Sequence, residues 1–218
     1  LDFKIIGKCC LNGMSDAIFQ ISANLVALVY NIQLLQFFGE NGVNAYGVIG
    51  YISFIFLSIF IGFTVGMEPV IGYNFGAQNH AELKNVLKKL LIIFGIGSVI
   101  MVLLSFFLAK PVTLIFFDSV KDAEVIELSV KAIRIYSFSF AFSGFCILIT
   151  SLFTGLNDGI VSGIISLVRS LIFQIIFVFL LPVIFGQEGI WYANLAAEFF
   201  SLVVSLVFLF AKKKKYHY

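Results

Sequence analysis

Six long apolar runs occupy most of this 218-residue chain, and they limit what it can fold into. A helix needs about 20 predominantly apolar residues to cross the roughly 30 Å hydrocarbon core of a bilayer. The runs predict six transmembrane helices, at about residues 13–38, 43–73, 86–109, 131–156, 159–185 and 189–211. Barrel strands would show short alternating segments instead of continuous apolar runs. The predicted fold class is therefore an all-α integral membrane protein.

The composition excludes the main alternatives to a membrane protein. Apolar residues make up 61% of the chain and charged residues 12%, whereas soluble domains average about 45–50% and about 25%. Such a chain has too little charge to cover a water-soluble surface, and its 27 Phe exclude disorder. Nucleic-acid binding is not expected, because the net charge is +2 and the basic run is confined to residues 212–215. The lipid bilayer is the expected partner.

The residues between the runs predict short turns and one long connection. Residues 157–159 have the sequence Asn-Asp-Gly, which favours a tight turn. Lys110 and Pro111 are expected to end the third helix. The segment 110–131 mixes both signs of charge, and it is expected to form a polar connection that carries a short surface helix.

The distribution of basic residues predicts how the six helices are oriented. An even number of spans places both termini on one side, and cytoplasmic loops carry an excess of Lys and Arg. The side opposite the termini holds at most four basic residues, namely Lys110, Lys121, Lys131 and Arg134. The side with the termini holds nine lysines, which are Lys4, Lys8, Lys84, Lys88, Lys89, Lys212, Lys213, Lys214 and Lys215. We therefore expect a multi-pass protein of the cell membrane with both termini in the cytoplasm.

The first apolar run carries a stripe of four polar side chains, Asp16, Gln20, Asn24 and Asn31. At 100° per residue they fall within an arc of about 80° on one helix face. Polar groups are costly in hydrocarbon and usually face a cavity or a partner. Helix–helix hydrogen bonds explain a single Asn, and a position near the membrane surface explains Asp16. A stripe of four favours a water-filled cavity, so these residues are candidates for lining a substrate or ion pathway.

The fourth run carries a similar stripe of hydroxyl groups. Its members fall within about 60° of one another on a continuous helix, and they are Tyr136, Ser139, Ser143, Thr150 and Thr154. Small hydroxyl residues let helix backbones approach closely. Packing is therefore slightly favoured over substrate contact for this stripe.

Arg169 and Glu198 interrupt the fifth and sixth runs at matching depths. Arg169 lies 11 residues after Asp158, about 16 Å into the membrane at the helical rise. Glu198 lies nine residues after Gly189, about 14 Å from the opposite surface. The two charges are expected to pair, because each alone is expensive in hydrocarbon. Such a pair is either a fixed interhelical salt bridge or the lining of a substrate or proton site.

An enzymatic function is not expected from this sequence. Both histidines, His80 and His217, fall in polar segments outside the apolar runs. The sequence shows no metal-ligand spacing, no nucleophile–base pair and no phosphate-binding glycine loop. Neither a metal nor an organic cofactor is therefore predicted.

Three motifs occur in order along the chain. Residues 66–79 read Gly-Met-Glu-Pro-Val-Ile-Gly-Tyr-Asn-Phe-Gly-Ala-Gln-Asn, residues 166–169 read Ser-Leu-Val-Arg, and Gly-Ile-Trp at 189–191 precedes Glu198. They resemble the Q-P-x-x-G-Y-N-Y/F-G-A signature, the S-L-x-R motif and the G-x-W…E motif of the MATE multidrug efflux family, especially its MepA-like branch. The signature positions are Glu68, Pro69, Gly72, Tyr73, Asn74 and Gly76.

The resemblance implies one lobe of a twelve-helix protein that is built from two six-helix lobes. This chain matches the C-terminal lobe, and the N-terminal lobe, which is absent from the chain, is the implied partner. The family's activity would be efflux of small organic, often cationic, compounds across the cytoplasmic membrane by antiport, with Na⁺ or H⁺ as the coupling ion. Alternating access by rocking of two lobes agrees with the logic of repeat-built transporters.

The sequence departs from the family pattern at three places. Glu68 stands where the family usually has Gln. The NorM-like branch has an acid near the middle of helix seven, where this chain has Asn24, with Asp16 two turns earlier. That branch has another acid in helix ten, where this chain has none between Lys131 and Asn157. A cation site of the NorM-like kind is therefore not expected in this lobe, and the absent N-terminal lobe is an alternative place for the coupling acid.

Two other functions remain open at the level of sequence. A lipid-linked oligosaccharide flippase of the wider superfamily would show several cations in its central cavity, and Arg169 is the clear basic candidate here. A membrane interaction or assembly protein without transport activity is the second alternative. An adjoining six-helix repeat in the same reading frame would favour the transporter.

Overall fold

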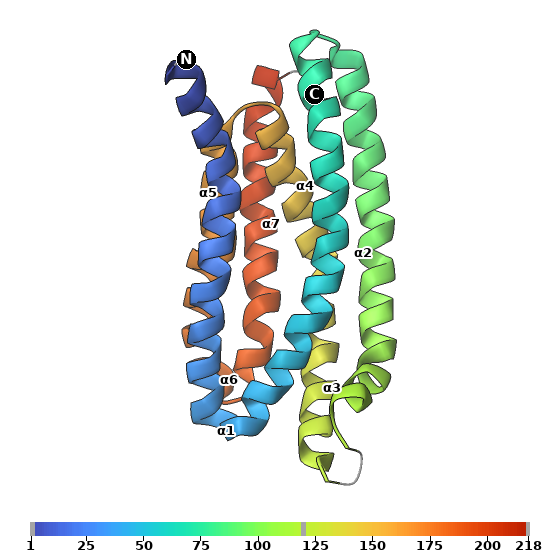
Figure 1. The fold of residues 1–218 in the computed structure, drawn as a ribbon, viewed down its shortest axis with the longest axis vertical. Coiled ribbons are helices and arrows are strands. Elements are labelled where there is room, and N and C mark those ends of the chain that lie inside the picture. Colours follow the sequence, from blue (N-terminus) through green and yellow to red (C-terminus); the bar gives the residue numbers. More distant parts are fainter. Residues whose placement is uncertain (1–2, 119–120, 217–218) are drawn as a thin grey trace.

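In the computed structural model, residues 3–118 and 121–216 are described, and their regular structure is entirely helical. The helices form one elongated bundle with both chain ends at the same end (Figure 1). This architecture confirms the predicted all-α fold class. The elements are α1 (Phe3–Gly76), α2 (His80–Phe116), α3 (Ala123–Ser137), α4 (Phe140–Gly155), α5 (Gly159–Leu167), the π-helical turn η1 (Val168–Ile172), α6 (Phe173–Phe185) and α7 (Gly189–Tyr216).

Helix α1 reverses direction at Gly39 and so forms two arms. Gly39 has φ 62° and ψ −151°, a backbone conformation that is open to glycine because it has no Cβ. Residues 3–38, the first arm, run down the bundle in Figure 1, and residues 40–76, the second arm, run back up. The turn between α6 and α7 lies at the same end of the bundle (Figure 1), and Gly186 in that turn has a similar φ of 68°.

Within its described residues, the chain passes along the bundle six times. Four helices are long and apolar enough to cross a membrane, and the pair α3 and α4, bent by 47° at its break, adds a fifth. Because the two arms of α1 run in opposite directions, α1 contributes two of the six passages (Figure 1). The side chains of Lys4 and Lys8, which the charge count uses, lie outside the described part of the chain.

The expectation that Lys110 and Pro111 end the third helix is wrong. Helix α2 continues through both residues to Phe116, and α3 already begins at Ala123. Proline is tolerated in transmembrane helices where neighbouring groups satisfy the freed backbone atoms. The two helices therefore cover most of the segment expected to be a polar connection, and its described residues contain no separate surface helix.

The second arm of α1 crosses α4 closely because glycines face each other there. A Cβ on Gly72 would lie 3.2 Å from the Gly155 carbonyl oxygen. A Cβ on Gly155 would lie 3.0 Å from Ile71 Cγ2 and 3.2 Å from the Glu68 carbonyl oxygen. Small residues at a crossing let two backbones approach. The crossing sets the position of the Glu68 side chain against α4.

Candidate functional site

A polar cavity of about 310 Å³ lies between the two arms of α1 and helices α4 and α5. It contains two carboxylates and one guanidinium, and we call it the acidic cavity. Acidic groups inside a membrane protein mark ion pathways and proton relays. Its polar lining residues are Asp16, Gln20, Thr64, Glu68, Thr150, Ser151, Thr154, Ser166 and Arg169.

The two carboxylates of the acidic cavity come from different arms of α1. Glu68 is half-buried, and its Oε1 accepts a hydrogen bond of 2.8 Å from Ser151 Oγ of α4. Asp16 lies on the exposed side of the first arm. Carboxylate oxygens can take a proton or coordinate a hard cation such as Na⁺. The cavity therefore offers one accessible acid and one acid anchored to α4.

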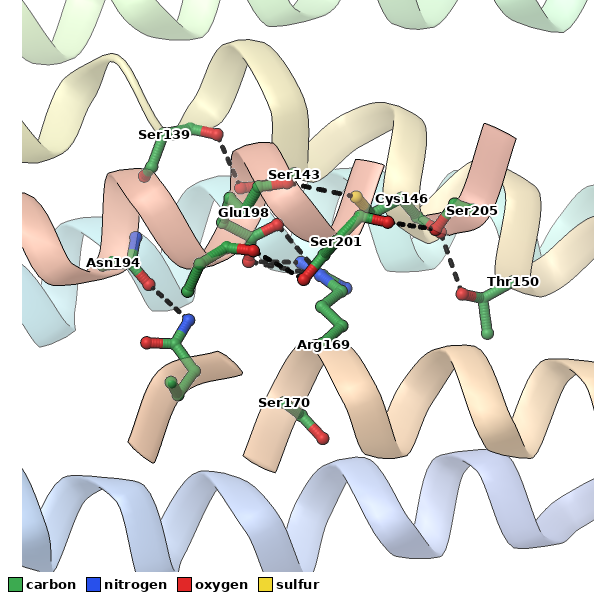
Figure 2. A network of polar contacts seen from close by, with 12 residues as sticks. Ser139, Ser143, Cys146, Thr150, Arg169, Ser170, Asn194, Glu198, Ser201 and Ser205 are labelled. Atoms are coloured by element: carbon green, nitrogen blue, oxygen red, sulfur yellow. Dashed lines mark hydrogen bonds and ion pairs between the residues drawn. The ribbon is translucent and has the colours of Figure 1, made fainter. Parts of the chain in front are cut away.

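Arg169 and Glu198 form a buried ion pair, as their matching depths predict. Arg169 Nε lies 3.0 Å from Glu198 Oε2 and 3.2 Å from Oε1, and Nη2 lies 3.1 Å from Oε1. Both residues are 6% exposed. Figure 2 shows the two side chains approaching each other, Arg169 from η1 and Glu198 from α7. The predicted pairing is confirmed, and several hydrogen bonds offset the desolvation of both charges.

The guanidinium is presented by a π-helical turn, η1, which interrupts the helix between α5 and α6. Ser170, beside Arg169, donates a hydrogen bond of 2.6 Å to the Ser166 carbonyl oxygen. Single π-helical turns inside α-helices are rare and occur often at functional sites. The sequence carries no signal for this turn, because its residues also suit an α-helix.

A second cavity, of about 150 Å³, lies on the other side of Arg169. Three tyrosines line it, so we call it the tyrosine cavity: they are Tyr30, Tyr46 and Tyr136. Tyr30 Oη donates to Gln174 Oε1 at 3.2 Å, and Gln174 Nε2 donates to Asn194 Oδ1 at 2.8 Å. These bonds connect the first arm of α1, α6 and α7.

Arg169 lines both cavities, whereas Glu198 lines the tyrosine cavity. The ion pair is thus part of the wall between two polar spaces that follow each other along the lobe. Any movement that separates the two charges would change this wall. The geometry permits a role in substrate or ion movement as well as in stability.

The structure brings together part of the predicted stripe on the first arm. Asp16 and Gln20 line the acidic cavity, together with Glu68 and Arg169. Asn24 is exposed, and its Nδ2 donates to the Gln20 carbonyl oxygen at 3.0 Å. Fifteen residues of helix span about 22 Å, so a stripe of this length extends beyond a cavity of 310 Å³.

Asn31, the last member of that stripe, lies in a different part of the lobe. It lines a separate groove of about 410 Å³, together with Glu40 and Asn44, close to the reversal at Gly39. Helical periodicity places Asp16 and Gln20 on one helix face, and both line the acidic cavity. It does not determine how far along the helix a cavity reaches.

The hydroxyl stripe of the fourth run is divided between packing and cavities. Ser143 Oγ donates to the Ser139 carbonyl oxygen at 2.8 Å, within the helix (Figure 2). Thr150 and Thr154 line the acidic cavity, and Tyr136 lines the tyrosine cavity. The 47° bend between α3 and α4 breaks the single face on which the five residues would otherwise lie.

Most residues of the 66–79 signature shape the backbone. Gly72 permits the crossing with α4. Asn74 Nδ2 donates to the Val70 carbonyl oxygen at 2.9 Å, and the Asn74 carbonyl oxygen accepts from Asn79 N at 2.9 Å. Pro69 and Tyr73 are exposed, and Gly76 ends α1. Glu68, by contrast, lines the acidic cavity.

Gln174 and Asn194, which link the helices around the tyrosine cavity, are not among the residues predicted from the sequence. Both are amide side chains inside long apolar runs, and this pattern could have identified them as residues that face a cavity or a partner. Tyr30 gave no such signal, because tyrosine is common in apolar segments. The sequence also contains no signal for Ser151, since its hydrogen bond to Glu68 depends on the crossing of α1 and α4.

A six-pass helical lobe that encloses charged, polar cavities is the architecture of a membrane transporter. The MatE family model matches residues 17–180, which is most of the chain. The chain therefore belongs to the MATE family of membrane transporters. A search of the curated proteins found no match.

Solved structures show the same fold. A crystal structure of MATE in complex with MaL6 has a TM-score of 0.87 at 19% identity, covering 95% of this chain and 47% of that chain. An outward-facing multidrug resistance MATE family transporter of the MOP superfamily has 0.84 at 20% identity, covering 93% and 46%. A MOP superfamily transporter from Pyrococcus furiosus, reported with a binding pocket of reverse polarity, gives the same values. This chain thus spans about half the length of these structures and matches one lobe.

Proposed function

We propose that this chain is the C-terminal lobe of a MepA-like multidrug efflux transporter. The transporter would expel organic, often cationic, compounds across the cytoplasmic membrane by antiport with Na⁺ or H⁺. The observation that carries the proposal is the acidic cavity, in which Asp16 and Glu68 lie with Arg169. The matched structures are about twice as long as this chain, which supports an N-terminal lobe as its partner.

The two carboxylates have different roles in this proposal. Glu68 is anchored by Ser151 and holds the coupling ion between the second arm and α4. Asp16 is more exposed and exchanges the ion with water or attracts the positive charge of a substrate. Asn24 extends the same exposed face of the first arm, which would face the other lobe.

The charges of the cavities favour an organic cation over a lipid-linked oligosaccharide. Among the described residues that line the two cavities, Arg169 is the cation, and its charge is neutralised by Glu198. Asp16 and Glu68 leave the acidic cavity with an excess of carboxylates. An anionic diphosphate carrier would be repelled there. A protein that only mediates assembly has no use for such groups, which are costly inside a membrane.

The test is ethidium efflux from a pump-deficient bacterial strain that expresses the complete transporter with this chain as one lobe. Asp16→Asn and Glu68→Gln each remove a carboxylate at nearly constant volume, and each should reduce energised efflux by about tenfold or more. Glu124→Gln makes the same chemical change in the exposed first turn of α3, and it should leave efflux unchanged. Normal efflux by both cavity variants at normal expression would refute the proposed site.

A further inference from the structure

Two connected grooves lie on the outside of the lobe, away from α1. The first, of about 900 Å³, is lined by α2, α3 and the start of α7, and its charged residues are Lys110, Glu127, Lys131 and Arg134. The second, of about 710 Å³, is lined by the α3–α4 break, α4, α6 and α7. Tyr192 lines both grooves, so the two grooves adjoin at this residue. We call them the basic groove and the aromatic groove.

The basic groove has an excess of positive charge. Three cationic side chains line it against one carboxylate, that of Glu127. Lys131 Nζ is paired with Glu188 Oε1 at 2.8 Å, and the Arg134 guanidinium lies 5.2 Å from the centroid of the Phe106 ring. Among the described residues, no carboxylate lies within ion-pair distance of Lys110 or Arg134. An exposed Lys and an exposed Arg that line the same groove suit a phosphate group.

The aromatic groove is apolar and exposed. Phe185 is 65% exposed, and Phe199 and Phe200 are 47% and 46% exposed. The Phe142 and Phe199 rings pack edge to face, with their centroids 5.5 Å apart. Such a surface matches an acyl chain. Tyr192, at the junction of the grooves, has an apolar ring and a polar hydroxyl, as residues at a membrane interface often do.

The order of these groups along the helices matches the polarity of a lipid. Lys110 is close to the end of α2, and Arg134 precedes Phe138 and Phe142 by one and two turns. The charged groups thus lie toward the end of the bundle opposite the termini, where α2 joins α3 (Figure 1), and much of the aromatic lining lies deeper. None of the described side chains of α1 lines either groove, and neither groove shares a lining residue with the acidic cavity.

We propose that the two grooves together bind one anionic phospholipid in the leaflet opposite the chain termini. Its phosphate lies between Lys110 and Arg134, and one acyl chain lies along the phenylalanines of the aromatic groove. The lipid bridges α2, α3, α6 and α7 on the outer surface of the lobe. This site does not depend on the substrate or the coupling ion of the acidic cavity.

Native mass spectrometry of the purified transporter that contains this chain tests the site. Delipidated protein is titrated with phosphatidylglycerol, with phosphatidylcholine of the same acyl chains, and with soluble glycerol phosphate. We expect one phosphatidylglycerol to be retained at concentrations at which the other two are not. Equal retention of both phospholipids would overturn the proposal, and retention of glycerol phosphate alone would show a free-phosphate site instead.

Two double variants, compared in their retention of phosphatidylglycerol, test where the lipid binds. Lys110→Gln combined with Arg134→Gln should weaken phosphatidylglycerol retention by about 30-fold, since the variant removes two basic contacts of about 1 kcal/mol each. Lys213→Gln combined with Lys214→Gln removes the same charge from the exposed tail and should leave retention unchanged. Equal losses in the two pairs would show non-specific attraction and refute the site.

A photoactivatable acyl chain provides a second measurement that does not require these variants to fold. Phosphatidylglycerol with a diazirine near the chain end should crosslink the wild-type protein at residues 138–142 and 195–200. Lys110→Arg combined with Arg134→Lys keeps both charges and should keep these crosslinks. Crosslinks spread over all lipid-facing helices would contradict a defined groove.

Discussion

The Arg169 guanidinium binds both carboxylate oxygens of Glu198 at a position where it also separates two polar cavities. The pair joins a π-helical turn to the middle of α7, and both residues are 6% exposed. A buried ion pair of this kind is weak evidence for stability by itself, because desolvation offsets much of the attraction. The consequence of removing one partner is larger, since a buried charge is then left without compensation.

Arg169→Met and Glu198→Leu should each destabilise the protein by about 3–5 kcal/mol. Glu198→Leu should be the more damaging change, because an orphaned carboxylate can take a proton whereas arginine does not lose its own. The double variant leaves no orphan charge and should recover most of the stability. Thermal unfolding in detergent, followed by size-exclusion chromatography, measures all three. Simply additive losses would mean that the side chains do not interact.

Efflux by the double variant then distinguishes a structural role of the ion pair from a role in transport. Near-normal efflux would show that the pair acts as a fixed connection between η1 and α7. Folded protein without efflux would show that the wall between the cavities serves substrate or ion movement. The control is Asn85→Ala, which removes an exposed side-chain hydrogen bond to Glu82 on α2 and should preserve both folding and efflux.

At the end of the bundle that carries the termini, Asp158 fixes the end of α7 to the turn between α4 and α5. Its Oδ2 accepts a hydrogen bond from Tyr216 Oη and lies 3.5 Å from Lys215 Nζ and 4.0 Å from Lys212 Nζ. The Tyr216 ring packs on Phe75, with their centroids 5.5 Å apart. Asp158→Asn should reduce stability by about 1–2 kcal/mol at neutral pH. Tyr216→Phe, which keeps the ring, should lose part of this amount.

The contribution of Asp158 should depend on pH in a defined direction. Burial alone would raise the pKa of its carboxyl, but the Tyr216 hydrogen bond and the charges of Lys215 and Lys212 together hold that pKa below its ordinary value. A carboxyl with a lowered pKa stabilises the folded state at neutral pH, and this stability disappears as the pH falls below about 4. The difference in melting temperature between wild type and Asp158→Asn should therefore vanish in acid. A constant difference from pH 7 to pH 3 would contradict this account.

The crossing of α1 and α4 predicts opposite effects for two Gly→Ala changes. A Cβ at Gly155 would lie 3.0 Å from Ile71 Cγ2 and 3.2 Å from the Glu68 carbonyl oxygen, so Gly155→Ala should push the helices apart and destabilise the lobe. A Cβ at Gly62 would meet nothing within 4 Å. Gly62→Ala should stabilise α1 by about 0.5–1 kcal/mol, because glycine loses more freedom on folding. Melting temperatures that move in the same direction would argue against a tight crossing.

The orientation inferred from the lysines is tested by labelling. Lys121→Cys and Gln78→Cys place thiols at exposed positions at opposite ends of the bundle, in a background without the native cysteines. A membrane-impermeant maleimide should label Lys121→Cys on intact cells, and should label Gln78→Cys only after permeabilisation. The reverse pattern would invert the assignment of the termini to the cytoplasm.

The sequence predicted the helical class and the Arg169–Glu198 pair because both follow from local rules. Apolar runs must be helical in a bilayer, and depth along a helix is the number of residues multiplied by the rise. The bend between α3 and α4 and the π-helical turn at Arg169 were not predictable, because neighbouring helices determine them. The same limit applies to Asn31: its helix face was visible in the sequence, but the extent of the cavity was not.

The length of the polar connection between the third and fourth predicted helices was overestimated for a related reason. A lysine followed by a proline ends many helices, yet here α2 continues through Lys110 and Pro111 to Phe116. Proline removes one backbone donor, but it does not end a helix whose other groups are satisfied. Composition therefore located the end of the apolar run, and not the end of the helix.

The central claim is that cations and organic compounds exchange through the acidic cavity. Proteoliposomes that contain the complete transporter and a trapped fluorescent indicator of pH or Na⁺ measure it directly. An imposed ethidium gradient should drive one of these cations in the opposite direction, and Glu68→Gln should abolish this flux while Glu124→Gln preserves it. Ethidium movement without an opposing cation flux, or an unchanged flux in Glu68→Gln, would contradict the account.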